Sequence, residues 1–197
     1  QRPGKNPGHR SDHMPTTMAH RSELQRGFSL IECLTVLGLL ALMMGMAVPG
    51  FQQMIANQTM RAQVDRLHVS LALARTQALT RMDHTIVCSS ADGLNCDGSG
   101  QWHRGWIVFV DHNRNRRLDP GEALLDRGEA MPEGLQATGP AARSRVRFQH
   151  MGYSPGTNLT IRFCDQRGAA HGSALIVSNV GRPRQVSGGL PPGSCSG

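Results

Sequence analysis

The stretch Gly-Phe-Ser-Leu-Ile-Glu at residues 27–32 opens an apolar run that continues to Val48. As a helix that rises ~1.5 Å per residue, residues 28–48 would be roughly 31 Å long, about the thickness of a bilayer's hydrocarbon core. The run therefore predicts a transmembrane helix. Glu32 is its only charged residue. A carboxylate in such a helix costs on the order of 2.5 to 3.5 kcal/mol on insertion scales, so Glu32 is either functional or snorkels to the headgroups.

The segment before the apolar run carries a positive charge. Residues 1–27 hold five basic and two acidic side chains, and positively charged flanks of a membrane helix stay in the cytoplasm. A Sec signal peptide is cleaved after its apolar region, but Val48-Pro49-Gly50 is a poor cleavage site. We therefore expect residues 1–27 to be a leader that is cleaved before the apolar run.

Gly27, Phe28 and Glu32 resemble the class III signal of type IV pilins and pseudopilins. The resemblance implies that a prepilin peptidase cuts between Gly27 and Phe28 and methylates the new amino terminus at Phe28. It also implies that Glu32 offsets the terminal ammonium of a neighbouring subunit during assembly, since a buried charge is tolerated when it is paired. Because Met18 could start a compact leader of the usual length, residues 1–17 are interpreted as an extension.

The composition is that of one basic domain on a helical stalk. The chain has 197 residues, and removing leader and anchor leaves about 150, enough for a single domain. A formal net charge of +7 favours anionic partners such as nucleic acid or anionic lipid. Aromatic residues make up only 4% of the chain, which argues against a platform that stacks on single-stranded bases.

The second half of the predicted helix is amphipathic. Pro49 and Gly50 are expected to interrupt or kink the helix. Apolar residues then recur at spacings of three and four, which predicts a helix over residues 49–83 with one packing face. The members of this stripe are Met60, Val64, Leu67, Leu71, Ala74, Ala78 and Met82.

Short apolar segments separated by turns follow, so residues 84–186 are expected to form a β-rich head. Residues 106–110 are continuously apolar and predict a central strand, whereas the alternation over residues 159–164 predicts a half-buried one. The predicted strands cover residues 85–89, 105–111, 123–127, 144–149, 159–165 and 174–179. The Gly/Pro/Ser-rich tail at 187–197 is expected to be flexible. The predicted fold is an α+β lollipop, with the helix packed on an antiparallel sheet or a small sandwich.

The five cysteines divide into two groups. Cys33 lies in the apolar run and is interpreted as an inert small hydrophobe. The other four belong to the exported part, where oxidation is permitted. Pairing Cys88 with Cys96 and Cys164 with Cys195 is preferred, although four cysteines allow three pairings. Their spacings are not those of a zinc site.

One polar loop resembles a calcium-binding loop. An EF-hand-like register would place oxygen ligands at positions one, three, five, nine and twelve, which here are Asp111, Asn113, Asn115, Asp119 and Glu122. Position six, normally Gly, is Arg116, and further arginines in the loop offset the acidic charge. We interpret the segment as a hairpin loop closed by ion pairs and expect no cofactor, with calcium binding as the alternative.

Catalytic motifs are not recognised in this chain. The nine histidines form no HExxH motif, no Ser/His/Asp set and no Cys/His dyad. A P-loop and a dinucleotide-binding fingerprint are also missing from the sequence. We therefore do not expect the chain to be an enzyme.

A Gly-Arg-Pro-Arg element occupies residues 181–184. In an extended backbone, Arg182 and Arg184 would project to the same side about 6 to 7 Å apart, close to the spacing of successive phosphates. Gly181 allows a turn, and Pro183 keeps the backbone extended. Arginine binds phosphate oxygens bidentately. From these residues alone, two arginines that solubilise an edge strand are an equally good interpretation.

The long helix, residues 102–111 and residues 178–184 together resemble the GspH/FimT family of minor pilins and pseudopilins, over nearly the whole mature chain. The Gly-Arg-x-Arg element is most similar to that of the FimT-type members, which bind DNA in natural transformation. The resemblance implies that Gly181, Arg182 and Arg184 bind double-stranded DNA. Arg162 and Arg167 are also predicted to bind DNA, because they lie on and just after the preceding predicted strand.

The resemblance also implies partners and a location. The subunit would sit in the bacterial inner membrane as a single-pass protein with its head in the periplasm, and then join other major and minor pilin subunits in a pilus or pseudopilus at the cell surface. We expect it to capture extracellular duplex DNA for uptake. One alternative is a structural minor pseudopilin of a type II secretion system, or a pilus-priming subunit, that binds no DNA. The other is a calcium-stabilised, adhesin-like pilin.

Overall fold

The computed structural model describes residues 27–195 and has an α+β fold. It contains one long helix, α1 (Leu30–Arg81), and two four-stranded antiparallel sheets. The chain divides into two compact units between residues 46 and 47. The predicted leader lies outside the described residues, except for Gly27.

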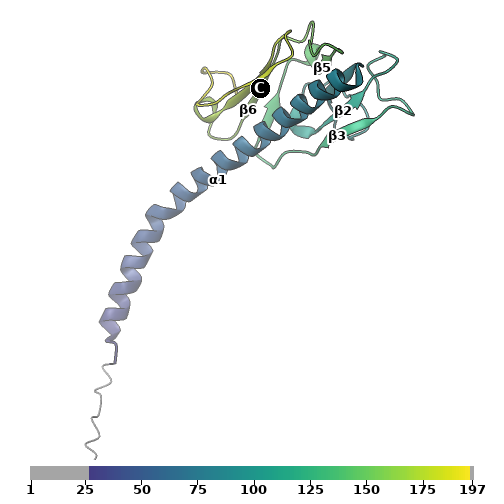
Figure 1. Ribbon diagram of the computed structural model, residues 1–197. Coiled ribbons are helices and arrows are strands. Elements are labelled where there is room, and N and C mark those ends of the chain that lie inside the picture. Colours follow the sequence, from purple (N-terminus) through teal and green to yellow (C-terminus); the bar gives the residue numbers. More distant parts are fainter. Residues whose placement is uncertain (1–26, 196–197) are drawn as a thin grey trace, which may run out of the picture. The chain divides into compact units, whose positions relative to one another are not determined.

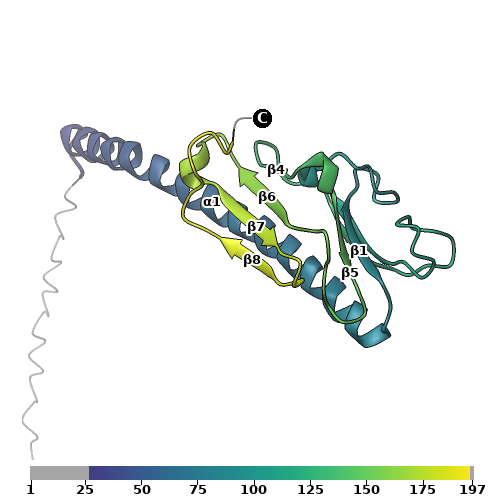
Figure 2. The same ribbon diagram turned by 90° about the horizontal axis from the view of Figure 1, so that it is seen from above.

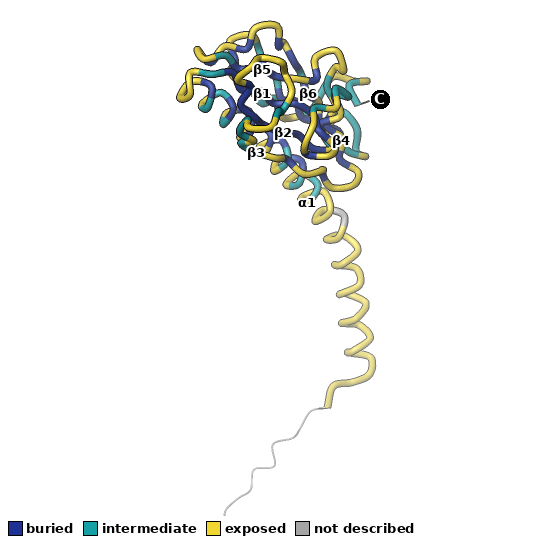
Figure 3. Tube along the Cα trace, turned by 90° about the vertical axis from the view of Figure 1, so that its right-hand side faces the viewer, coloured by how far each residue is buried: buried dark blue, intermediate teal, exposed yellow. Residues whose placement is uncertain are grey.

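The first unit is an apolar helical segment with exposed side chains. The helix begins where the carbonyl oxygen of Ser29 accepts the N–H groups of Glu32 and Cys33, at 3.0 and 3.2 Å. By length and composition, α1 is able to cross a membrane. Every described side chain from 27 to 46 is exposed, as the yellow part of the tube shows (Figure 3). An apolar surface of this kind needs lipid or another protein to cover it.

The second half of α1 carries the predicted packing stripe, with one correction. The helix continues through Pro49 and Gly50, where the sequence predicted an interruption or a kink. Six of the seven predicted stripe residues are buried, but Met82 is 70% exposed. The helix has already ended at Arg81, and Met82 adopts a left-handed conformation with a φ of 55°. The chain therefore turns away before Met82 can join the stripe.

The head consists of two sheets. The first has the strand order β3-β2-β1-β5 and the second has the order β4-β6-β7-β8. The strands of the first sheet are β1 (Thr85–Ser89), β2 (Trp106–Val110), β3 (Leu124–Gly128) and β5 (Arg145–Phe148). Those of the second are β4 (Gln136–Thr138), β6 (Leu159–Cys164), β7 (Ser173–Val177) and β8 (Pro183–Val186). Figure 2 shows β6, β7 and β8 side by side, with β1 and β5 in a separate layer. Strand β2 is buried along its length and lies inside its sheet, as predicted.

The stripe of α1 packs against the inner faces of both sheets and so forms one core. Figure 1 shows this part of the helix alongside the strands of the head. The indole N–H of Trp106 donates to the hydroxyl of Ser70 on α1 at 2.9 Å, and that hydroxyl donates to Asp126 at 2.5 Å. The guanidinium of Arg66 lies 5.7 Å from the centre of the Trp106 ring. Burying a side chain of this size stabilises the fold by about 1.5–3 kcal/mol, so the first sheet is firmly attached to the helix.

The outer face of the first sheet is also covered. Four side chains on this face form a second buried cluster, namely Ile86, Cys88, Ile107 and Phe109. Cys96 and Leu118 pack on this cluster from two loops. The predicted disulfide between Cys88 and Cys96 holds one of these loops in place.

The predicted disulfide between Cys164 and Cys195 is also present, and it anchors the C-terminal tail to β6. It joins the last residue of β6 to the end of the described chain. The N–H of Leu190 also donates to the carbonyl of Ala169 at 2.8 Å. Attachment at these two points corrects the expectation of a flexible tail over residues 187–195. Cys33 is a free, exposed cysteine.

Candidate nucleic-acid interface

The Gly-Arg-x-Arg element begins in the turn between β7 and β8. The N–H of Gly181 donates to the carbonyl of Ser178 at 2.8 Å and closes the turn. Gly181 has a φ of +74°, and a Cβ atom there would lie 2.1 Å from the carbonyl oxygen of Gly152. Backbone conformation and close approach therefore both require glycine at this position. Gly181 therefore sets the backbone conformation of the Gly-Arg-x-Arg element, and it has no side chain that could contact a ligand.

The segment between β5 and β6 holds this turn in place. The N–H of Ser154 donates to the carbonyl of Asn179 in the turn at 2.9 Å. The hydroxyls of Ser154 and Thr157 are hydrogen-bonded at 2.6 Å, and both residues are buried. The Nε of Arg75 on α1 donates to the carbonyl of Gly152 at 3.2 Å. The turn is thereby attached to the helix as well as to its own sheet.

Sheet register places Arg162 and Arg184 on one face. Arg184 of β8 pairs with Ile176 of β7, which pairs with Thr160 of β6, and Arg162 lies two residues after Thr160. Paired residues share a face, as do residues two apart on one strand. The Cα atoms of Arg162 and Arg184 are therefore roughly 12 Å apart. Arg182 lies two residues before Arg184, and the side chains of all three arginines are exposed.

This outer face of the second sheet is basic. Its outward positions follow from the register and are Gln136, Thr138, Thr160, Arg162, Cys164, Ala174, Ile176, Arg184 and Val186. None of them is acidic. Within residues 27–195 the salt bridges are His112–Asp83 and Arg167–Asp165, so neither Arg162 nor Arg184 takes part in one. Their guanidinium groups can therefore bind an external anion.

Arg167 differs from the other predicted interface residues. Its Nη2 lies 2.6 Å from a carboxylate oxygen of Asp165, and its Nη1 donates to the side chain of Asn57 on α1 at 2.7 Å. Burial alone would raise the pKa of Asp165, but hydrogen bonds and charge from Arg167 outweigh it and lower that pKa. Arg167 therefore attaches the end of β6 to the helix. This geometry argues against its predicted role in DNA binding.

The calcium-like loop is held by its own hydrogen bonds. Asp111 is buried, which raises its pKa, and one of its oxygens accepts the N–H of Arg116 at 3.2 Å. Arg116 has a φ of 65°, the left-handed conformation for which position six normally uses glycine. Asp119 accepts from the side chain of Asn113 at 2.7 Å. A calcium ion would have to replace these bonds. In the described part of the chain, no group of three His, Cys, Asp or Glu residues is placed to hold a metal ion.

The predicted assembly residues lie at the start of α1. Gly27 and Phe28 precede the helix, and Phe28 is 82% exposed. Glu32 lies in the first helical turn, where a negative charge interacts favourably with the helix dipole. Cleavage between Gly27 and Phe28 and a role of Glu32 in assembly remain predictions.

Comparison with known families covers most of this structure. The profile described as "Type II transport protein GspH" matches residues 63–181. The chain belongs to the GspH family. A second profile, the prokaryotic N-terminal methylation motif, matches residues 24–48 of this GspH-family protein.

Individual relatives agree with this assignment. The pilin-like protein PilA1 of Thermus thermophilus is 34% identical over 102 residues, 50% of this chain and 56% of PilA1, so the match spans about half of that relative. The minor pilin FimU of Pseudomonas aeruginosa superposes with a TM-score of 0.54 at 21% identity, covering 69% of this chain and 94% of FimU. The minor pseudopilin EpsH of Vibrio cholerae has a TM-score of 0.48 at 13% identity, covering 66% and 98%. The superposition on FimU confirms the predicted α+β fold of this GspH-family chain.

The structure also brings together basic residues that the sequence analysis did not single out. Arg145 and Arg147 were included only as part of the predicted strand 144–149, and Arg143 immediately precedes it. Three arginines at every second position were an available signal, because alternate residues of a strand share a face. Arg116 joins them from the calcium-like loop.

Proposed function

We propose that this minor pilin binds double-stranded DNA without sequence preference, through Arg182 and Arg184 and with Arg162 on the same face. The proposal rests on one observation: exposed arginines without salt-bridge partners gather on a sheet face that carries no carboxylate among its outward positions. Phosphate contacts of this kind carry no base information, so binding is independent of sequence. The function requires no cofactor.

Affinity would come from several weak contacts. Each neutralised phosphate contributes a slope of about −0.9 to the logarithmic salt dependence of binding. Three arginines in one subunit give modest affinity that falls steeply with salt. Subunits that engage one duplex together would bind it more tightly. Retraction of the pilus would then draw extracellular DNA across the outer membrane in natural transformation.

Export and assembly would precede DNA binding. A prepilin peptidase cuts between Gly27 and Phe28 and methylates Phe28, while α1 anchors the subunit in the inner membrane with its head in the periplasm. Glu32 then pairs with the terminal ammonium of a neighbouring pilin in the filament. The match to the N-terminal methylation motif and the exposed apolar segment of α1 support this order.

A second candidate is a structural subunit that binds no DNA, either in a type II secretion pseudopilus or in pilus priming. Met151, Tyr153 and Val180 are at least half exposed. The close approach of Gly152 to Gly181 brings the segments that carry them together. Apolar side chains grouped on a surface favour contact with another protein, here a neighbouring subunit.

Titration of labelled duplex DNA separates the two candidates. The full chain in an uncharged detergent is compared with R182Q/R184Q and with the matched variant R61Q/R81Q, which removes two exposed positive charges from α1. Fluorescence anisotropy at about 50 mM and about 200 mM NaCl gives affinity and salt slope. We expect wild type and R61Q/R81Q to bind, and R182Q/R184Q to bind at least about tenfold more weakly with a slope smaller by about 2.

Equal affinity of R182Q/R184Q and R61Q/R81Q would show that the site is assigned incorrectly. A wild-type chain that binds no DNA at either salt concentration would favour the structural candidate. Matching melting temperatures of the variants are the control for folding.

A further inference from the structure

A basic cleft lies at the β5 edge of the head, apart from the Gly-Arg-x-Arg element. Its volume is about 370 Å³. Arg116, Arg143, Arg145 and Arg147 line it, together with neutral residues, and no carboxylate belongs to the lining. We call this group of four arginines the arginine cleft.

Local structure explains why these side chains converge. Arg145 and Arg147 are two residues apart on β5 and pair with Cys88 and Ile86 of β1, so both point to the outer face of the first sheet. Arg143 comes from the short 3-10 helix Ala141–Arg143, immediately before β5. The core positions of β5 alternate with these arginines, so their side chains point away from the core.

Arg116 reaches the cleft from a different part of the chain. Its backbone is left-handed, which costs a non-glycine residue of order 1 kcal/mol or more. The hydrogen bond from its N–H to the buried Asp111 holds that conformation. Strain of this kind persists where surrounding structure enforces it, and it is concentrated at binding sites.

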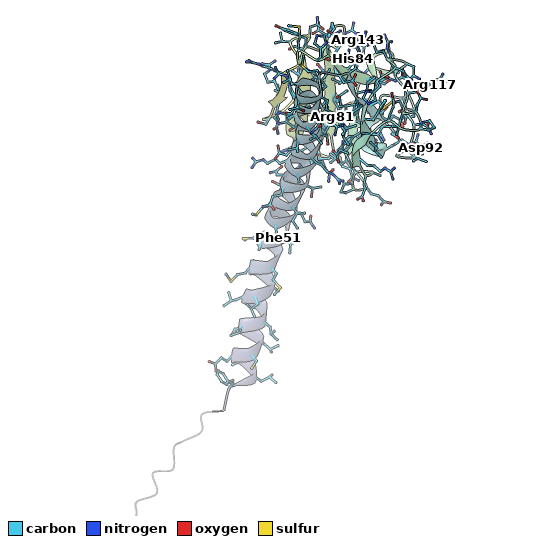
Figure 4. The ribbon with its side chains drawn as sticks, turned by 45° about the vertical axis from the view of Figure 1, so that its right-hand side comes forward. Phe51, Arg81, His84, Asp92, Arg117 and Arg143 are labelled. Carbon is cyan, nitrogen blue, oxygen red and sulfur yellow. A yellow bond between two sulfur atoms is a disulfide. The ribbon has the colours of Figure 1, made fainter. Side chains whose placement is uncertain are left out.

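The charges of the cleft are not balanced within the described chain. None of the four arginines forms a salt bridge among residues 27–195, and Arg143 donates from Nη1 to the carbonyl of Asn158 at 3.0 Å. Burial lowers the pKa of the nearby His84, and the charges of Arg114 and Arg147 lower it further, whereas Asp111 and Asp83 raise it. Figure 4 labels Arg143 and His84 at the same end of the head. Like charges held together in this way attract a multivalent anion.

Phosphate groups are the anions that this cleft fits best. The guanidinium fork binds phosphate oxygens bidentately, and arginine is over-represented where phosphate or carboxylate groups are recognised in this way. Ser144 and Thr157 add hydroxyl groups to the lining.

The cleft and the Gly-Arg-x-Arg element share a common support. Residues 152–158 contact the β7–β8 turn through Ser154 and Asn179 and contact Arg143 through Asn158. The same segment supplies Pro155, Gly156 and Thr157 to the cleft. The two basic regions therefore lie on either side of one short loop.

We propose that the arginine cleft is a second phosphate-binding site, and that it holds the backbone of the same duplex whose neighbouring phosphates bind Arg182 and Arg184. The second part of this proposal rests on the proposed function. The DNA footprint then extends from the second sheet across the 152–158 loop to the first sheet.

Substitutions in the cleft test the proposal in the full chain in uncharged detergent. The same labelled duplex is titrated into R145Q/R147Q, the charge-preserving R145K/R147K and the matched R61Q/R81Q. We expect R145Q/R147Q to lose about tenfold in affinity and about 2 in salt slope. R145K/R147K should keep the slope and lose only a few-fold in affinity, since lysine keeps the charge without the fork. An affinity and slope of R145Q/R147Q equal to those of R61Q/R81Q overturn the proposal.

A second measurement identifies the source of the phosphate. Inorganic pyrophosphate is added to wild type and to R145Q/R147Q, and the melting temperature is recorded. A rise that only wild type shows, without an effect of R145Q/R147Q on duplex binding, assigns the cleft to a free phosphorylated anion and overturns the duplex contact. If R182Q/R184Q binds DNA normally while R145Q/R147Q does not, the proposed function has failed at its site and the cleft is retained.

Discussion

The outer faces of the two sheets are built in opposite ways. On the first sheet, the disulfide Cys88–Cys96 and a second loop bury an apolar cluster that contains Ile107 and Phe109. On the second sheet, no described residue of the outer face belongs to a buried cluster, and Arg162 and Arg184 stand exposed. The inner faces of both sheets pack on the same helix.

The difference between the two outer faces indicates where a partner can bind. Loops cover the apolar cluster of the first sheet, and the arginine cleft lies along its β5 edge. The second sheet keeps its outer face available at β8, an edge strand. The covered apolar cluster on the first sheet thus contributes more to stability than the open outer face of the second sheet, and substitutions can test this difference.

The largest expected effect is on the covered face. Phe109→Ala should lower the free energy of unfolding by about 3–5 kcal/mol, because it empties a fully buried site. Ile176→Ala, on the outer face of the second sheet, removes a half-buried side chain and should cost about 1 kcal/mol. Urea unfolding followed by the fluorescence of the two buried tryptophans measures both. Equal losses of unfolding free energy would show that the two outer faces do not differ in their contribution to stability.

Gly181→Ala should have the next largest effect. The added Cβ meets both a left-handed backbone and the carbonyl of Gly152, so a loss of about 2–3 kcal/mol is expected. The matched control is Gly156→Ala, where φ is +77° and no atom lies within 4 Å of the Cβ position. That control should cost about 1 kcal/mol from backbone strain alone. A control that is as destabilised as Gly181→Ala would show that the contact with Gly152 is unimportant.

Arg167→Gln should have the smallest effect, with a characteristic pH dependence. It removes the partner that lowers the pKa of Asp165, at an expected cost of about 1–2 kcal/mol. A carboxylate with a lowered folded-state pKa stabilises the fold above its ordinary pKa of 3.8, and this stabilisation is lost as pH falls through the folded value. The difference between wild type and variant should therefore be constant from about pH 7 to about pH 5 and shrink below about pH 4.

DNA affinity supplies the second readout for Arg167→Gln. We expect it to match wild type, since the Arg167 guanidinium is bound to Asp165 and Asn57. A loss of DNA affinity as large as that of Arg184→Gln would show that Arg167 belongs to the DNA interface.

Local sequence patterns predicted the helix and strands in which the buried residues follow a regular pattern. Strand β2 was predicted because its five residues are apolar throughout, and α1 because its stripe recurs at helical spacing. Strand β8 was not among the predicted strands, because it begins with Pro183 and is half polar, and an edge strand there was only one of two interpretations. Pairing with β7 makes it a strand. The left-handed turn at Met82 depends on how the helix ends, which periodicity does not report.

The candidate binding site was likewise predictable only where its residues are close together in the sequence. A short motif pointed to Arg182 and Arg184 because their relation is local. The fate of Arg167 depends on Asn57, which is 110 residues away in the sequence. The arginine cleft likewise combines Arg116 with a strand almost thirty residues later. Contacts between distant segments decide which arginines are occupied and which remain available.

The disulfide between Cys164 and Cys195 has a mechanical consequence. Strands β7 and β8 lie wholly inside the covalent loop that it closes. A pull on any residue of that loop reaches Cys164 along two covalent routes, so the load is shared. If β8 peels from its neighbour under tension, the 31-residue separation of the two cysteines, a contour length of roughly 100 Å, cannot be drawn out. A head loaded through this segment could therefore lengthen by only part of that contour length.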